Sequence, residues 1–142
     1  GKEHFTKFIS THFHLAMKLG HAALWCADLE AVRTFYETYF NGRSGPKYVN
    51  PTKGFESYFI RFEGDAALEI MRSTQVVERG ATPGLGWCHI SFTVGSEEAV
   101  HTLTEHLRAD GYRILSEPRR TGDGFYESSV ADPEGNPVEI CA

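Results

Sequence analysis

Apolar and polar residues follow the same order of patterns twice along this chain. In the first half, an apolar run is followed by apolar residues at helical spacing behind a helix N-cap candidate, Asp28. Asn41-Gly42 is a helix stop, and Gly45-Pro46 is typical of a loop. Two-residue alternation and a second apolar run then predict further strands. The predicted elements are a strand at 22–26, a helix at 29–40, and strands at 56–62 and 66–71.

The second half repeats this order. Ser96 is the N-cap candidate of a helix that Gly111 ends, and Asp132-Pro133-Glu134-Gly135-Asn136 is a strong turn signal. The predicted elements are a strand at 87–94, the helix, a strand at 112–115, a loop at 119–124, a strand at 125–130 and a final strand ending at Ile140.

The repeat predicts an α+β fold of two βαβββ modules. Because one module cannot bury its sheet alone, we expect the two to form a curved mixed sheet around a cavity, with the helices outside. We predict a single domain at 17–142, with module one at 17–75, a linker at 76–86 and module two at 87–142. Residues 1–16 precede the repeat and are expected to be an N-terminal extension.

Two His–Glu pairs occupy matched places in the repeat. His21 and His89 open the two modules, and Glu69 and Glu139 lie in the apolar runs that close them. A single His or Glu in an apolar strand is often explained by a buried hydrogen bond. Two neighbouring buried carboxylates, however, are costly without a cation. The duplicated placement therefore predicts a four-ligand metal site, suited to Zn²⁺, Ni²⁺, Co²⁺, Mn²⁺ or Fe²⁺ rather than Ca²⁺.

Composition and charge restrict the classes of partner and the cellular location that we expect. The formal net charge of −5 and the absence of a long basic run argue against a nucleic-acid partner. No apolar stretch is long enough for a membrane span. The 3 cysteines are odd in number and form no C-x-x-C pair, so we expect reduced thiols and a cytoplasmic protein.

Several motifs resemble the vicinal oxygen chelate superfamily, which includes glyoxalase I, bleomycin-resistance proteins and extradiol dioxygenases. The resemblance covers residues from about Met17 to Ala142. It rests on Gly-His-Ala-Ala-Leu-Trp-Cys-Ala-Asp-Leu-Glu from Gly20, Leu68-Glu69-Ile70, Cys88-His89-Ile90-Ser91-Phe92, and the D-P-x-G-x-x-x-E ending from Asp132 to Glu139.

The resemblance implies that His21, Glu69, His89 and Glu139 hold one divalent metal. The full set is similar to that of bacterial glyoxalase I (lactoylglutathione lyase) and of acyl-CoA epimerases. It implies a lyase or isomerase that transfers a proton through an enediolate in a small oxygenated substrate. Glu139 is the expected base, and Glu69 is a second candidate. A non-catalytic, drug-binding protein similar to bleomycin-resistance proteins is the alternative.

The chain also departs from glutathione-dependent glyoxalase I. Trp25 and Ser73 stand where that enzyme typically has an arginine and an asparagine, so glutathione dependence is in doubt. Arg72, Arg119 and Arg120 are candidates for holding an anionic substrate instead. Alternate residues of the open strands are expected to line the cavity, with candidates Tyr58, Arg61, Phe125 and Tyr126.

The resemblance further implies a homodimer that acts on a small molecule. In some relatives each site lies within one chain. In others, His21 and Glu69 of one chain would meet His89 and Glu139 of the second. The sequence is compatible with both arrangements.

Overall fold

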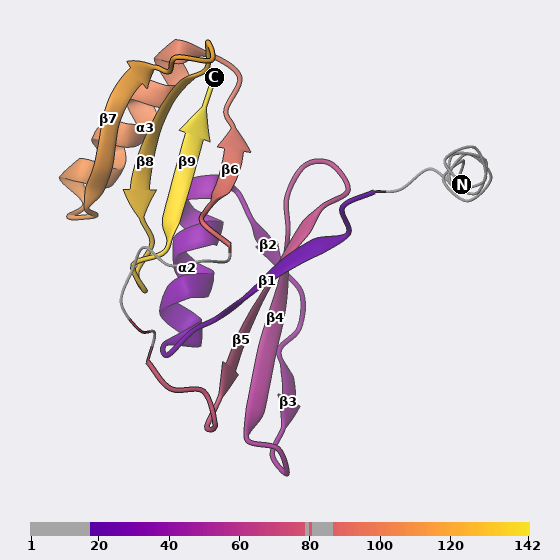
Figure 1. Ribbon diagram of the computed structural model, residues 1–142. Coiled ribbons are helices and arrows are strands. Elements are labelled where there is room, and N and C mark those ends of the chain that lie inside the picture. Colours follow the sequence, from indigo (N-terminus) through magenta and orange to yellow (C-terminus); the bar gives the residue numbers. More distant parts are fainter. Residues whose placement is uncertain (1–17, 79, 81–86) are drawn as a thin grey trace, which may run out of the picture.

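The computed structural model describes residues 18–78, 80 and 87–142. They form two βαβββ modules, each a sheet with a helix against one side (Figure 1). The α+β fold class is thereby confirmed. The two modules keep separate sheets within the chain instead of sharing one. The predicted extension at 1–16, residue 17, and residues 79 and 81–86 of the predicted linker lie outside the described residues.

Module one contains a five-stranded sheet in the order β1-β5-β4-β2, with β3 also paired to β4. β1 runs parallel to β5, and the other pairs are antiparallel. Its elements are β1 (His21–Trp25), α2 (Leu29–Phe40), β2 (Arg43–Ser44), β3 (Tyr48–Asn50), β4 (Phe55–Arg61) and β5 (Ala67–Ser73).

Module two repeats this topology in four strands, in the order β6-β9-β8-β7. β6 runs parallel to β9, as β1 does to β5. Its elements are β6 (Ile90–Thr93), α3 (Glu97–Ala109), β7 (Ile114–Arg120), β8 (Tyr126–Ala131) and β9 (Pro137–Cys141). The matched pairing of first and last strands confirms the duplication.

Both predicted helix starts are confirmed. The Asp28 carboxylate accepts a hydrogen bond from the Ala31 N–H at 3.0 Å, and the Ser96 hydroxyl accepts one from the Ala99 N–H at 3.1 Å. Asn41 ends α2 in the left-handed conformation, with φ of 54°.

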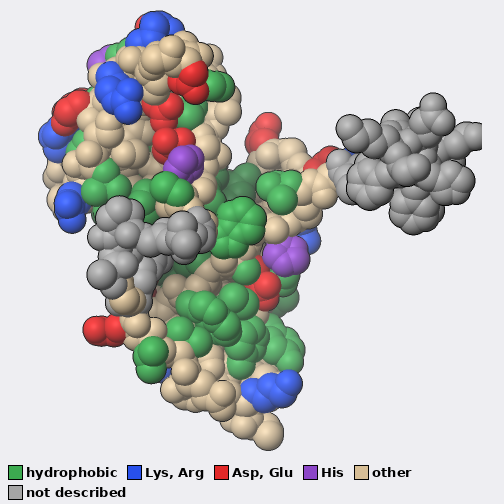
Figure 2. Space-filling view, viewed as in Figure 1, with side chains coloured by type: hydrophobic (Ala, Val, Ile, Leu, Met, Phe, Trp, Pro, Cys, Tyr) green, Lys and Arg blue, Asp and Glu red, His purple; other side chains and the backbone are tan. Residues whose placement is uncertain are grey.

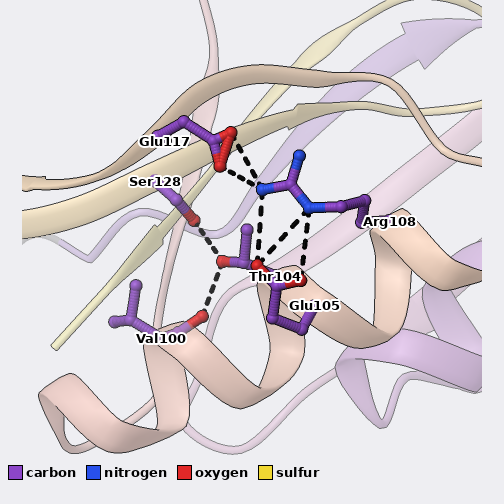
Figure 3. Close-up of polar contacts among 6 residues, drawn as sticks. All are labelled: Val100, Thr104, Glu105, Arg108, Glu117 and Ser128. Carbon is purple, nitrogen blue, oxygen red and sulfur yellow. Dashed lines mark hydrogen bonds and ion pairs between the residues drawn. The ribbon is translucent and has the colours of Figure 1, made fainter.

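Each helix packs with its apolar side on one face of its sheet. The opposite face of each sheet is left open. In module two, the Thr104 hydroxyl lies at this interface, where it donates to the Val100 carbonyl at 2.6 Å and contacts the Ser128 hydroxyl at 2.7 Å (Figure 3). Nearby on the surface, Arg108 forms ion pairs with Glu105 and Glu117. The buried core includes Val32, Phe35, Tyr36, Ile60, Leu68, Ile70, Val100, Leu107, Val130, Val138 and Ile140.

Helix α2 also connects the two modules. The rings of Phe40 and Phe92 lie 4.4 Å apart between centroids. The Tyr36 hydroxyl donates to the buried Asp132 carboxylate at 2.8 Å. Burial and the adjacent Asp132 raise the pKa of Tyr36, so this hydroxyl stays protonated as a donor. The relative placement of the modules is therefore fixed by apolar packing and by a buried hydrogen bond.

Three details differ from the sequence-based expectations. The strand predicted at 87–94 is shorter, because β6 covers only Ile90–Thr93. The short strands β2 and β3 were not predicted. β7 continues to Arg120, although a loop was predicted from Arg119. Pro118 lies within β7, and the register with β8 shifts before Arg119. Because β7 is an edge strand, a residue without an N–H is tolerated there.

The described residues include no helix that is both long and apolar enough to cross a membrane.

Candidate metal centre

The first predicted ligand pair lies on the open face of the module-one sheet. Alternation along β5 directs Leu68 and Ile70 into the core and leaves Glu69 on the opposite face. His21 starts the neighbouring strand, β1, on the same face. Its Nε2 lies 3.8 Å from Oε1 of Glu69.

The second pair has the same placement in module two. Val138 and Ile140 are buried on the helix side of β9, and Glu139 between them faces the open side. Nε2 of His89 lies 2.9 Å from Oε1 of Glu139. In both modules the glutamate lies opposite the residue two positions after the histidine in the register of the parallel strands. Glu69 is opposite Ala23, and Glu139 is opposite Ser91.

The two pairs do not meet within one chain. In the described part of the protein, no three of the four predicted ligands bring their donor atoms within 4.8 Å of one another. Figure 2 shows histidine surface beside acidic surface at two separate places, one on each module. Each module therefore presents half of the predicted ligand set.

The surroundings of the first pair are aromatic and cationic. Glu69 lines a cavity of about 660 Å³ on the open face of module one. Phe59, paired directly with Glu69 across β4 and β5, has its ring centroid 5.3 Å from that of His21. The other aromatic and cationic side chains of this cavity are Tyr48, Phe55, Arg43 and Arg61.

The surroundings of the second pair are polar. Donor atoms of Glu127, Glu139 and Cys141 all lie within 4.8 Å of one another. The Ser91 hydroxyl lies 3.0 Å from the Cys141 sulfur. Burial and the neighbouring Glu127 raise the pKa of Glu139, and His89 opposes that shift. The cluster was missed in the sequence, although the alternation of Glu127 and Ser129 along β8 indicates its face.

The three arginines proposed to hold an anion have different positions. Arg72 forms an ion pair with Glu56 at 3.3 Å, and Arg120 pairs with Glu97 on α3. Both are neutralised by carboxylates of the protein. Arg119 is paired across the sheet with Glu127, and its Nε donates to the Ser116 hydroxyl at 3.3 Å. Of these three, Arg119 is the one next to the open-face cluster.

The predicted cavity-lining residues divide by strand alternation. Arg61 lines the cavity of module one, as expected. Tyr58 instead faces the helix side, where its hydroxyl donates to Glu30 at 2.7 Å. Tyr126 contacts His101 of α3, and Phe125 is exposed. The two positions that depart from glutathione-dependent enzymes, Trp25 and Ser73, lie near Phe55 at the far end of the same open face.

Comparisons with known proteins agree with this architecture. Residues 18–140 match the model of the Glyoxalase/Bleomycin resistance protein/Dioxygenase superfamily. The chain is 29% identical over 130 residues to the uncharacterised protein YqjT of Bacillus subtilis (strain 168), which covers 86% of this chain and 96% of that protein.

Solved structures show the same fold. A possible glyoxalase from Bacillus cereus is 27% identical and has a TM-score of 0.68, over 89% of this chain and 100% of its own. The trypanothione-dependent glyoxalase I of Leishmania major is 20% identical and has a TM-score of 0.72, over 89% and 86% of the two chains. With its duplicated βαβββ modules and the family match over nearly its whole length, the chain belongs to the Glyoxalase/Bleomycin resistance protein/Dioxygenase superfamily.

Proposed function

We propose that this protein is a divalent-metal-dependent lyase or isomerase similar to glyoxalase I. It would move a proton next to a carbonyl group, through an enediolate, in a small oxygenated substrate. The observation that carries the proposal is the His–Glu pair at the same register of each sheet, with His–Glu distances of 3.8 and 2.9 Å.

The donor set fits a transition-metal ion. Two ligands that each lie about 2.0–2.2 Å from one Zn²⁺ are themselves roughly 3 Å apart, close to the separation within each pair. Imidazole nitrogen and carboxylate oxygen together suit Zn²⁺, Ni²⁺, Co²⁺, Mn²⁺ or Fe²⁺. His21, Glu69, His89 and Glu139 would hold the ion.

Glu139 is the proposed catalytic base. A divalent metal held by these four residues would polarise a substrate carbonyl and so acidify the neighbouring C–H. Glu139 would take that proton and return it to the adjacent carbon. Glu69, in the matching position, is the second candidate.

Two chains would build each site. His21 and Glu69 of one chain would join His89 and Glu139 of the partner subunit. This arrangement is supported by the separation of the two pairs within the chain and by the contacts of α2 that fix the modules. Exposed aromatic side chains on the open face of module one, Trp25, Tyr48 and Phe59, would be covered in such a homodimer.

Mixing two defective variants tests the shared site. H21A/E69A lacks the module-one ligands, and H89A/E139A lacks those of module two. If the site is shared, each mixed dimer regains one intact site. Random mixing would then restore about one quarter of the wild-type sites, because half of the dimers are mixed. If each site lies within one chain, unfolding and refolding the two variants together would restore none.

Metal content tests the proposal as a whole. Elemental analysis should find about one first-row divalent ion per chain in the wild type, and much less in E69A/H89A. Metal-loaded protein would then be screened with hemithioacetals and acyl thioesters. The acyl thioesters test the epimerase-like alternative. A wild type that remains metal-free after reconstitution would contradict the enzyme proposal.

The aromatic cavity of module one favours one alternative function. A non-catalytic protein could bind a flat, apolar drug against Tyr48, Phe55 and Phe59. In that case E139Q would leave ligand binding unchanged, and no turnover would be found for the wild type or for E139Q.

A further inference from the structure

Two arginines lie directly opposite each other at one edge of the module-one cavity. Arg43 on β2 pairs with Arg61 on β4 in the antiparallel register, so both occupy the open face. In the described part of the chain, neither guanidinium has a hydrogen-bond or ion-pair partner. Arg33, Arg72, Arg108 and Arg120, in contrast, each contact a carboxylate.

Like charges that face each other across a sheet are destabilising. Solvent screens part of that repulsion, because both arginines are exposed. An anion between them would remove it. Paired guanidinium groups also provide several N–H donors, whose planar geometry matches a carboxylate or phosphate group.

The sheet register connects this pair to the proposed metal ligands. His21, Ala67, Arg61 and Arg43 form one row across β1, β5, β4 and β2. With strands about 4.8 Å apart, the Arg61 backbone is roughly 10 Å from that of His21. Ala67, between them, has a small side chain that leaves room above the sheet. Glu69 lies two residues from Ala67 on the same strand and face.

We propose that Arg43 and Arg61 bind an anionic group of the substrate, remote from the two oxygens that would chelate the metal. The substrate would then be a small hydroxy or oxo compound with an additional carboxylate or phosphate group. This inference rests on the proposed function, since it takes the His21–Glu69 pair as the place of the chelating oxygens.

Malate and lactate are suitable probes. Each has a hydroxyl and a carboxylate oxygen on neighbouring carbons, and malate has one further carboxylate. Calorimetric titration of Zn²⁺-loaded wild-type protein should give at least a tenfold lower Kd for malate than for lactate, as expected for charge-assisted hydrogen bonds. In R43Q/R61Q the two Kd values should become nearly equal, with unchanged zinc content.

A control variant matches the change in charge. K53Q/R113Q also removes two exposed cationic side chains, both outside the cavity lining, and should keep the wild-type preference. The inference is overturned if the wild type does not prefer malate, or if R43Q/R61Q retains the preference.

A second titration separates this inference from the proposed function. If the wild type takes up none of Zn²⁺, Ni²⁺, Co²⁺, Mn²⁺ and Fe²⁺, the proposed metal enzyme is wrong. Inorganic phosphate, titrated into metal-free protein, then decides the role of the arginines. R43Q/R61Q should lose phosphate binding that the wild type and K53Q/R113Q retain. Equal phosphate binding by all three proteins, or none by the wild type, would overturn the inference.

Discussion

The two modules have the same topology and the same His–Glu pair, but the side chains around the pairs differ in chemistry. Glu69 faces Phe59 across the sheet, and the cavity beside it is lined by aromatic rings and two arginines. Glu139 faces Ser129, and Glu127 and Cys141 lie close by. We infer that both modules keep the same positions for the proposed ligands. In the proposed enzyme, the open face of module one would bind the substrate, and that of module two would transfer the proton.

The most severe test of this division compares the two glutamates. E139Q should lower turnover of an accepted substrate by about 100-fold or more, because a positioned general base contributes roughly 10²–10⁴-fold. E69Q should cause a clearly smaller loss. Both rates are to be measured at equal metal content, so that loss of the base is separated from loss of the ion. Equal losses would mean that the two carboxylates have equivalent roles.

A second comparison concerns the turns that precede the last strand of each module. Asp132 is buried and accepts hydrogen bonds from the Tyr36 hydroxyl and from the backbone N–H groups of Glu134 and Asn136. D132A should lower the free energy of unfolding by about 3 kcal/mol, because one buried hydroxyl and two partly buried N–H groups lose their acceptor.

Asp65, in the turn of module one, is the matched control. Its carboxylate forms an exposed ion pair with Lys18 at 2.8 Å. D65A should change the free energy of unfolding by less than about 0.5 kcal/mol, as measured by urea denaturation. If D65A and D132A had similar effects, the buried contact between modules would not be a major source of stability.

Substitution of the residues that face the two glutamates should have a smaller effect, on the affinity for the metal. Phe59 packs edge-on against the His21 ring and helps to fix its orientation. F59A should weaken Zn²⁺ binding by about 3- to 10-fold, because support of a ligand affects metal affinity. S129A, at the matching position of module two, should change it by less than about twofold. A competition titration with a chromophoric chelator measures both, and a larger effect of S129A would contradict this view of module one.

The smallest expected effect is on the pH dependence of stability. The pKa of Glu139 is raised, so the folded metal-free protein holds this proton more tightly than the unfolded chain. The resulting stabilisation is full below the ordinary pKa of a glutamate and is lost as the pH rises through the raised value. Urea unfolding between about pH 4 and pH 7 measures it, since that range includes the ordinary pKa.

E127Q is the informative variant here. It removes the neighbouring carboxylate that contributes to the raised pKa, so the pH dependence should become flatter. E117Q removes a carboxylate that forms an ion pair with Arg108 instead, and it should leave the pH dependence contributed by Glu139 unchanged. An unaltered profile in E127Q would indicate that burial alone raises the pKa.

The elements with local signals were predicted well. Asp28 and Ser96 mark the helix starts, and alternation in β4, β5 and β9 indicates which residues face the open side. β2 and β3 have two and three residues, too few for a periodic pattern, and they depend on pairing with β4. The position of Arg43 opposite Arg61 was therefore not predictable from local sequence.

The separation of the two His–Glu pairs has a similar explanation. The duplication identifies matched positions, but the angle between modules is set by contacts such as Tyr36–Asp132 and Phe40–Phe92. These join residues far apart in the sequence, and no local pattern indicates them. The sequence therefore predicts two matched His–Glu pairs, but it does not predict how the two pairs lie relative to each other.

The Glu134 carboxylate also has a consequence for the order in which the chain folds. It accepts hydrogen bonds from the backbone N–H groups of Ala27 and Asp28, both at 2.7 Å, at the start of α2. The start of α2 is thus completed by a residue of the turn between β8 and β9. On the ribosome, module one would emerge long before Glu134 is synthesised and would leave these donors to water until then. The native contacts of α2 with module two must therefore await synthesis of Glu134, and a nascent chain stalled before it would expose Phe40 and its apolar neighbours to chaperones.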